Sequence, residues 1–147
     1  MQGRRLFLAI AAPMALFASA TPAAAAVINV VKNASCGCCA KWVEYLKQAG
    51  HSVRVTNVAD VTPTAKRLGV PDDLRSCHTA SVGGYVIEGH VPAADIARLL
   101  REKPVAAGLS VPGMVAGSPG MEMGGPNPHY QVILFACDGR RKLFAQH

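Results

Sequence analysis

Three of the five cysteines in this chain lie within four residues, in the segment Cys36-Gly37-Cys38-Cys39. A cysteine thiolate is both a nucleophile and a ligand for soft metal ions, and the partial positive charge at a helix N-terminus favours its ionised form. Crowded thiolates repel one another. We therefore expect this segment to hold either a disulfide or a metal cation shared among several sulfurs.

Both kinds of chemistry fit the spacing of these cysteines. Cys36 and Cys39 have the two-residue separation of a thioredoxin-type redox pair, which favours a thiol-disulfide oxidoreductase with Cys36 as nucleophile and Cys39 as resolving thiol. Cys38 lies between them and offers competing disulfides, whereas metal ligation has no such conflict, because one sulfur can bridge two soft ions. With Cys77 brought alongside, the site would have four sulfur ligands.

The choice of metal follows from ligand softness. Structural zinc sites usually take pairs of cysteines from two loops, but here one loop supplies three. Cu(I) prefers thiolate and thioether ligands, and methionines occur in the Gly/Pro-rich segment 105–128, so we predict a copper site and keep a structural zinc module as an alternative. The further candidate ligands are His78, Met114, Met121 and Met123. We favour His78 over His90 and His129, and expect Cys137 at the end of a strand.

Residues 1–26 have the layout of an export signal. Arg4-Arg5 precedes an apolar, alanine-rich stretch, and small residues follow as far as Ala26, so both a Sec and a twin-arginine signal fit. The apolar stretch is short for a membrane span. We expect cleavage after Ala26, release into the periplasm, and no stable insertion in the membrane.

Residues 27–147 then form a domain of about 120 residues, enough for one compact core. Removing Arg4 and Arg5 lowers the formal net charge from +6 to about +4, and the remaining basic residues are scattered. No aromatic residues alternate with them on a basic face, so the sequence gives no reason to expect nucleic acid binding.

The hydrophobic pattern predicts a mixed α/β domain. We expect strands over 27–31, 52–58 and 85–88, helices over 39–49, 62–69 and 92–103, and a closing β-hairpin with strands 130–135 and 142–145. The apolar first strand is expected to be buried on both faces, and the first helix to carry Cys39 and Trp42 toward the core. The cysteine turn follows the first strand, where open α/β sheets place their sites.

This plan resembles the thioredoxin fold, in which the redox cysteines occupy the same turn between a strand and a helix. One feature departs from it: no proline stands directly before the expected strand 85–88, where thioredoxins carry a cis-proline. The segment 105–128 has no periodic pattern, and we interpret it as a long flap near the cysteine turn.

Four motifs together resemble the exported bacterial metal-binding family that includes the copper-resistance protein CopG. They are Cys36-Gly37-Cys38-Cys39, Cys77-His78-Thr79, the stretch 84–93, and the repeated Pro-Gly-Met of 108–122. The resemblance implies a thioredoxin-like domain that binds several Cu(I) ions in a thiolate-bridged cluster, with Cys36, Cys38, Cys39 and Cys77 as ligands. It also implies copper detoxification in the periplasm, with interconversion of Cu(I) and Cu(II) and with other periplasmic copper-handling proteins as partners.

Overall fold

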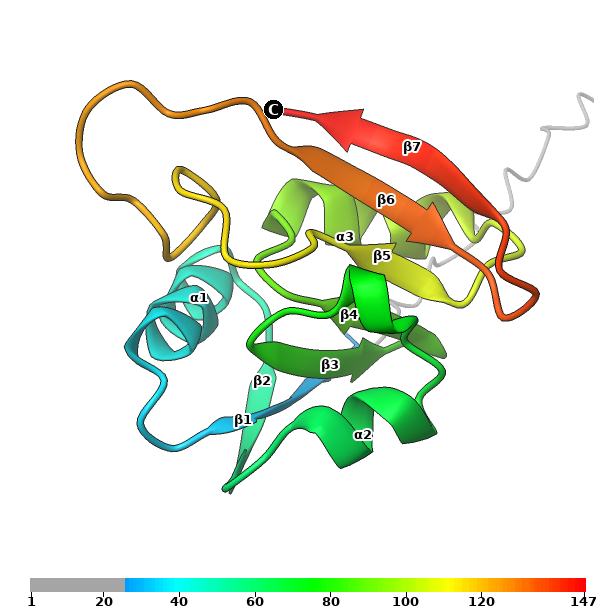
Figure 1. Ribbon diagram of the computed structural model, residues 1–147, viewed down its shortest axis with the longest axis horizontal. Helices are drawn as coiled ribbons and strands as arrows, with labels where there is room; N and C mark the ends of the chain where they lie inside the picture. The colour runs from blue at the N-terminus through cyan, green and yellow to red at the C-terminus, as the bar shows by residue number, and fades with distance from the viewer. Residues whose placement is uncertain (1–25) are drawn as a thin grey trace, which may run out of the picture.

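The computed structural model describes residues 26–147. These residues form a mixed α/β domain around a seven-stranded sheet with the strand order β2-β1-β3-β4-β5-β6-β7 (Figure 1). The fold class predicted from the sequence is confirmed. The expected export segment, apart from Ala26, lies outside the described residues. Within the described residues, no helix has the length and apolar character that crossing a membrane requires.

Strands and helices alternate as far as α2, and the rest of the chain contains two hairpins, β3–β4 and β6–β7. The strands are β1 (Ile28–Asn33), β2 (Val53–Val58), β3 (His78–Val82), β4 (Tyr85–Glu88), β5 (Gly108–Ser110), β6 (Gln131–Phe135) and β7 (Arg141–Gln146). The helices are α1 (Gly37–Gln48), α2 (Thr62–Arg67) and α3 (Ala93–Glu102), with a 3₁₀ turn over Asp72–Leu74.

Strands β1 and β2 are parallel and connected by α1, as the alternating pattern predicts. The expectation that the first strand is buried on both faces is wrong, because burial along β1 alternates. Ile28, Val30 and Lys32 are buried, whereas Asn29 is exposed and Val31 half-buried. The apolar run therefore has one core-facing side and one side that solvent reaches.

Strand β3 was not predicted, and it changes the interpretation of the cysteine turn. It pairs antiparallel with both β1 and β4, and it connects to β4 through Gly83-Gly84, whose φ angles of 56° and 86° suit a tight hairpin turn. The strand 85–88, expected to be the third, is the fourth. In the comparison with the thioredoxin fold, the position directly before the third strand therefore belongs to Cys77 and not to the Gly83-Gly84 pair.

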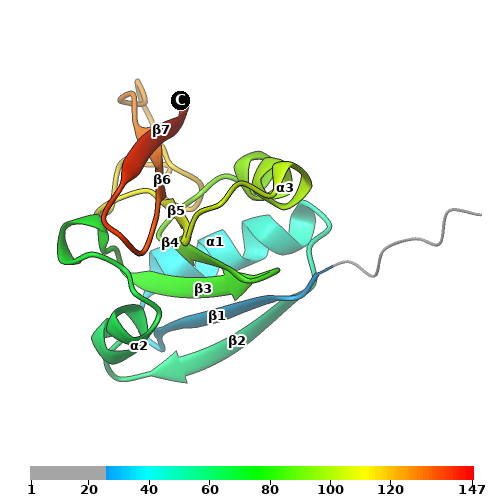
Figure 2. The same cartoon turned by 90° about the vertical axis from the view of Figure 1, so that its right-hand side faces the viewer.

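Two hydrophobic cores cover the two faces of the sheet. The larger core packs α1 and α3 against the sheet, and Figure 2 shows these two helices on the same side. The smaller core joins Ala65 of α2 with Val70, Leu74, Val86 and Phe135. Val86 and Ile87 are neighbours in β4 but belong to different cores, because successive side chains of a strand point to opposite faces.

The segment 105–128 was expected to contain no regular structure, but it contains β5. This strand is only three residues long and pairs parallel with β4 and antiparallel with β6. A Cβ atom at Gly108 would lie 1.9 Å from the carbonyl oxygen of Val86, so only glycine allows the backbones to approach this closely. The rest of the segment forms a long loop that arches beside α1 (Figure 1).

Candidate metal centre

The cysteine turn begins with a local hydrogen-bonded turn after β1. The Asn33 side-chain oxygen accepts hydrogen bonds from the backbone N–H of Ser35 at 2.9 Å and from its hydroxyl at 2.6 Å, an arrangement typical of asparagine in turns. Cys36 then occupies the N-cap of α1, where its Sγ accepts from the backbone N–H of Cys39 at 3.3 Å. This places Cys36, Cys38 and Cys39 at the positive end of the helix.

The pairing of β1 with β3 brings the fourth sulfur to this turn. Lys32 near the end of β1 pairs with His78 at the start of β3, so Cys77 lies at the sheet edge from which α1 begins. Its Sγ is 3.9 Å from that of Cys38, and the Sγ of Cys39 lies 3.4 Å from the Cys77 carbonyl oxygen. All four sulfurs lie within 4.8 Å of one another.

The four cysteines divide into two pairs. Cys36 and Cys39 form a disulfide, whereas Cys38 and Cys77 are free, and the Cys36 and Cys38 sulfurs are 3.5 Å apart. Cys39 is fully buried on the core-facing stripe of α1, as expected. The other three are half-buried, so solvent reaches the cluster from one side.

A second group of ligand atoms shares Cys77. It contains Cys77, His78 and His90, again with one atom of each within 4.8 Å of the others. His90 Nε2 lies 3.1 Å from Cys77 Sγ, and His90 Nδ1 lies 2.8 Å from the carbonyl oxygen of Pro119. A carbonyl only accepts hydrogen bonds, so Nδ1 carries the proton. The lone pair of Nε2 therefore faces the Cys77 sulfur.

His78 is fully buried and stacks beside Trp42, with ring centroids 4.3 Å apart. Burial, together with the nearby His90, lowers the pKa of His78 to about 3, so its imidazole is neutral at physiological pH. Its Nδ1 lies 3.5 Å from Cys77 Sγ, and its buried Nε2 has no hydrogen-bond partner among the described residues. Trp42 is part of the core, as predicted, and donates its indole N–H to the Val91 carbonyl.

Burial also alters the Cys77 thiol. Desolvation, followed by the neighbouring Cys38, raises the pKa of Cys77 to about 11, so the metal-free side chain is protonated at neutral pH. A soft metal ion binds the thiolate, so coordination by Cys77 must release a proton. Binding at this sulfur is therefore expected to strengthen as pH rises.

A buried carboxylate holds the backbone on both sides of Cys77-His78. Glu88, at the end of β4, accepts hydrogen bonds from the backbone N–H of Ser76 and from the Thr79 hydroxyl, each at 2.7 Å. Glu88 is fully buried, and burial raises its pKa. Through these two contacts, the β3–β4 hairpin fixes the position of the Cys77 backbone.

The long loop packs directly on the cysteine turn, as the interpretation of this segment as a flap predicts. A Cβ atom at Gly120 would lie 2.8 Å from the backbone nitrogen of Trp42 and 2.9 Å from the carbonyl oxygen of Cys38. The preceding residue, Pro119, supplies the carbonyl that orients His90. The loop therefore covers one side of the site and fixes the ring of His90.

The methionines of the loop differ in exposure. Met114 and Met123 are exposed, whereas Met121 is half-buried next to Gly120. Cys137 is exposed directly after β6 and is free, in agreement with its expected place at a strand end. His129 is exposed, and its Nδ1 lies 3.2 Å from the His147 carbonyl oxygen. Neither belongs to the two groups of ligand atoms.

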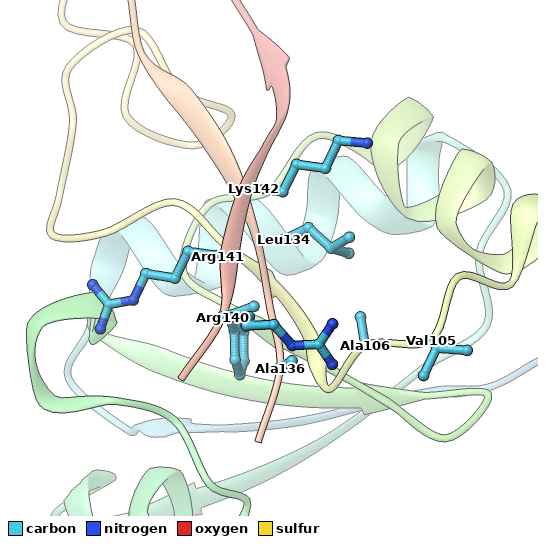
Figure 3. Close-up of a pocket in the computed structure, with 8 residues that line it drawn as sticks. Val105, Ala106, Leu134, Ala136, Arg140, Arg141 and Lys142 are labelled. Atoms are coloured by element: carbon cyan, nitrogen blue, oxygen red, sulfur yellow. The ribbon is translucent and has the colours of Figure 1, made fainter. Parts of the chain in front are cut away.

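A hollow of about 250 Å³ lies elsewhere, on the C-terminal hairpin (Figure 3). Its lining includes Leu134, Arg140, Arg141 and Lys142, and contains no cysteine or histidine. Arg140 pairs with Asp138, and Arg141 pairs with Asp73. The soft ligands are therefore concentrated at the cysteine turn and not in this hollow.

The close packing of the loop on α1 predicts that alanine substitution at two glycines with similar backbone conformations will lower stability by different amounts. Gly120 and Gly124 have φ angles of 84° and 74°, but a Cβ atom at Gly124 meets nothing within 4 Å. Gly124→Ala should cost only the strain of a positive φ, about 1 kcal/mol. Gly120→Ala should lower the free energy of unfolding by about 1–3 kcal/mol more, because the loop must move off the helix. Urea unfolding measures both values, and equal losses would contradict this packing.

Comparison with known proteins found one family model and two solved structures that match this chain. A family model described as "Protein of unknown function, DUF411" matches residues 74–121, and no curated protein matches the chain. The solved structure of copper resistance protein CopG, form 2, is 43% identical, has a TM-score of 0.79, and covers 83% of this chain and 98% of its own. Form 1 is 44% identical, has a TM-score of 0.78, and covers 82% and 96%. The chain therefore belongs to the CopG family of copper resistance proteins.

Proposed function

We propose that this protein is a periplasmic copper-resistance protein that holds several Cu(I) ions on the thiolates of Cys36, Cys38, Cys39 and Cys77. The observation that carries the proposal is the convergence of these four sulfurs within 4.8 Å of one another. Four thiolates at that separation repel strongly, and soft cations that bridge them remove the repulsion. The CopG structures, which are named for copper resistance, support copper as the ion.

The four-thiolate site requires the Cys36–Cys39 disulfide to be opened, because a disulfide sulfur is a poor metal ligand compared with a thiolate. In the reduced chain, the helix N-terminus favours the ionised form of Cys36. His90 adds a nitrogen donor on the Cys77 side through Nε2, and His78 adds a second through Nδ1. Met121 is the methionine best placed to contribute, since it adjoins the glycine that contacts α1.

Anaerobic titration of the reduced protein with Cu(I) tests this proposal. We expect more than one Cu(I) per chain, because four thiolates in one cluster can bridge several ions. Cys77→Ser should lower the number of bound ions by at least one. Cys137→Ser is the matched control and should change nothing, since Cys137 lies outside both groups of ligand atoms. One bound ion, or an unchanged number in Cys77→Ser, would contradict the cluster.

The disulfide itself favours a second candidate function, thiol-disulfide exchange. Cys36 is half-buried while Cys39 is fully buried, the asymmetry expected of an accessible nucleophile and a protected resolving thiol. The β1-α1-β2 unit followed by the β3–β4 hairpin also fits the thioredoxin-like fold that the sequence predicts.

An insulin-reduction assay separates this candidate from copper binding. If the protein exchanges disulfides, the metal-free protein with dithiothreitol should accelerate insulin precipitation. That activity should survive Cys38→Ser, which leaves the pair intact, and disappear in Cys36→Ser, which removes the nucleophile. An inert metal-free protein would eliminate the second candidate and leave the copper site as the function.

Export remains a proposal that rests on residues 1–26. We expect the chain, expressed in full in a Gram-negative host, to appear in the periplasmic fraction with Val27 as its first residue, as measured by intact-protein mass spectrometry. Lysine at both Arg4 and Arg5 should block export if the signal is of the twin-arginine type, and should leave a Sec signal working. Full-length protein confined to the cytoplasm would contradict the proposal.

A further inference from the structure

Strand β7 forms one open edge of the sheet. It is last in the strand order, so among residues 26–147 only β6 pairs with its backbone. The backbone N–H of Ala136 donates to the Arg140 carbonyl at 3.0 Å, so the Arg140 carbonyl faces β6. Because peptide groups alternate between the two sides of a strand in an antiparallel pair, those of Arg141 and Leu143 point away from β6, toward the open edge.

The part of this edge that another strand can reach is short. Ile133 pairs with Leu143 and Val132 pairs with Ala145, so Phe144 is the extra residue of a β-bulge. The Arg98 guanidinium donates a hydrogen bond to the Phe144 carbonyl at 2.6 Å, so that acceptor is already used. The available edge therefore runs over residues 141–143.

Two hollows flank this edge, one on each face of the sheet. One of about 220 Å³ includes Leu134, which packs against the larger core. The other, of about 260 Å³, includes Ile133, which packs against the smaller core. Lys142 and Leu143 line both hollows. Successive side chains of a strand paired with β7 would point into these two hollows in turn.

The charged side chains of the two hollows favour an acidic ligand. Three are basic and one is acidic: Arg98, Arg141, Lys142 and Glu102. Arg98 lies 3.6 Å from Glu102, and Arg141 pairs with Asp73. Lys142 is exposed and makes no ion pair within residues 26–147. Basic side chains on an edge strand oppose unselective pairing, and an acidic strand is the partner that turns their repulsion into attraction.

The two faces of the edge differ in what they offer. Figure 3 shows Lys142 and Arg141 directed to opposite sides of β7, with Leu134 on the side of Lys142. Leu143 alternates with Lys142 along the strand and is 48% exposed. A paired strand therefore places acidic side chains next to Lys142 on one face, and on the other face apolar side chains that cover Leu143.

We propose that β7 is the docking edge for an acidic, extended segment of a partner protein, which adds to the seven-stranded sheet as a further antiparallel strand. Its backbone bonds to the outward peptide groups of Arg141 and Leu143, and its side chains enter the two hollows. Figure 1 shows the turn between β6 and β7 at the opposite end of the molecule from the start of α1. The docking edge is therefore separate from the cysteine turn, and the inference does not depend on metal binding.

The first test uses a short fluorescent peptide of alternating glutamate and valine, titrated into the protein and followed by fluorescence anisotropy. Residues opposite Arg141 and Leu143 share their face, so the valines are the residues that bond to the edge. We expect saturable binding, and N-methylation of the valines should weaken it about tenfold or more, because it removes those N–H donors. N-methylation of the glutamates is the matched control and should change it little. Equal losses, or no binding of the unmodified peptide, would overturn the inference.

Two variants with the same change of charge test the place of binding. Lys142→Glu should weaken binding of the acidic peptide about tenfold or more, because it puts like charges opposite each other. Arg54→Glu lies on β2, the other edge of the sheet, and should leave the affinity nearly unchanged. Both side chains are exposed, so both variants are expected to fold. Equal weakening in the two variants would show that the peptide responds only to net charge, against the inference.

Amide hydrogen exchange, read by NMR, tests the added strand itself. Saturating peptide should slow exchange of the Arg141 and Leu143 backbone N–H groups about tenfold or more, because both become hydrogen-bonded. The N–H groups of β2 should exchange as before. Phosphatidylglycerol vesicles test the other anionic surface that could meet these basic residues. Vesicle binding that Lys142→Glu abolishes, with no protection of Arg141 and Leu143 by the peptide, would assign the edge to a membrane and overturn the inference.

Discussion

The antiparallel pairing of β1 with β3 is the constraint on which the site depends. Strand β1 ends where α1 begins, and β3 starts at that same edge of the sheet. Cys77 therefore lies beside cysteines that are 38 to 41 positions away in the sequence. Without this register, the turn after β1 would offer only three sulfurs on one short segment. With it, four sulfurs form one group of ligand atoms, and Cys77 forms a second group with two imidazoles.

The other features of the site hold this arrangement in place. Glu88 ties Ser76 and Thr79 to the end of β4, and the loop contributes Gly120 against α1 and the Pro119 carbonyl against His90. Burial keeps both histidines neutral by lowering the pKa of each. Neutral imidazoles are metal ligands, whereas protonated ones are not. The protein thus presents soft, uncharged nitrogen donors next to thiols that ionise when a metal binds.

Much of the fold and of the candidate site could be predicted from the sequence, because strong local patterns mark them. The cysteine spacing, the stripe containing Cys39 and Trp42, and the β4 boundaries needed no tertiary information. Strand β3 was missed because His78–Val82 is short and lacks a run of large β-branched residues. Without β3 there was no reason to rank His90 as highly as His78. The Gly83-Gly84 turn sets the antiparallel register in which Thr79 pairs with Glu88. Two residues before Thr79 in the chain is Cys77, and two residues after Glu88 is His90, so the same register places Cys77 opposite His90.

The central claim is that copper binds to the sulfurs at this turn. X-ray absorption at the copper K-edge of the Cu(I)-loaded, fully reduced protein tests it most directly. The account predicts a ligand shell made mainly of sulfur, together with scattering from a neighbouring copper ion, because bridging thiolates hold the metals close together. A shell of only nitrogen and oxygen, or a single isolated copper without sulfur neighbours, would contradict it.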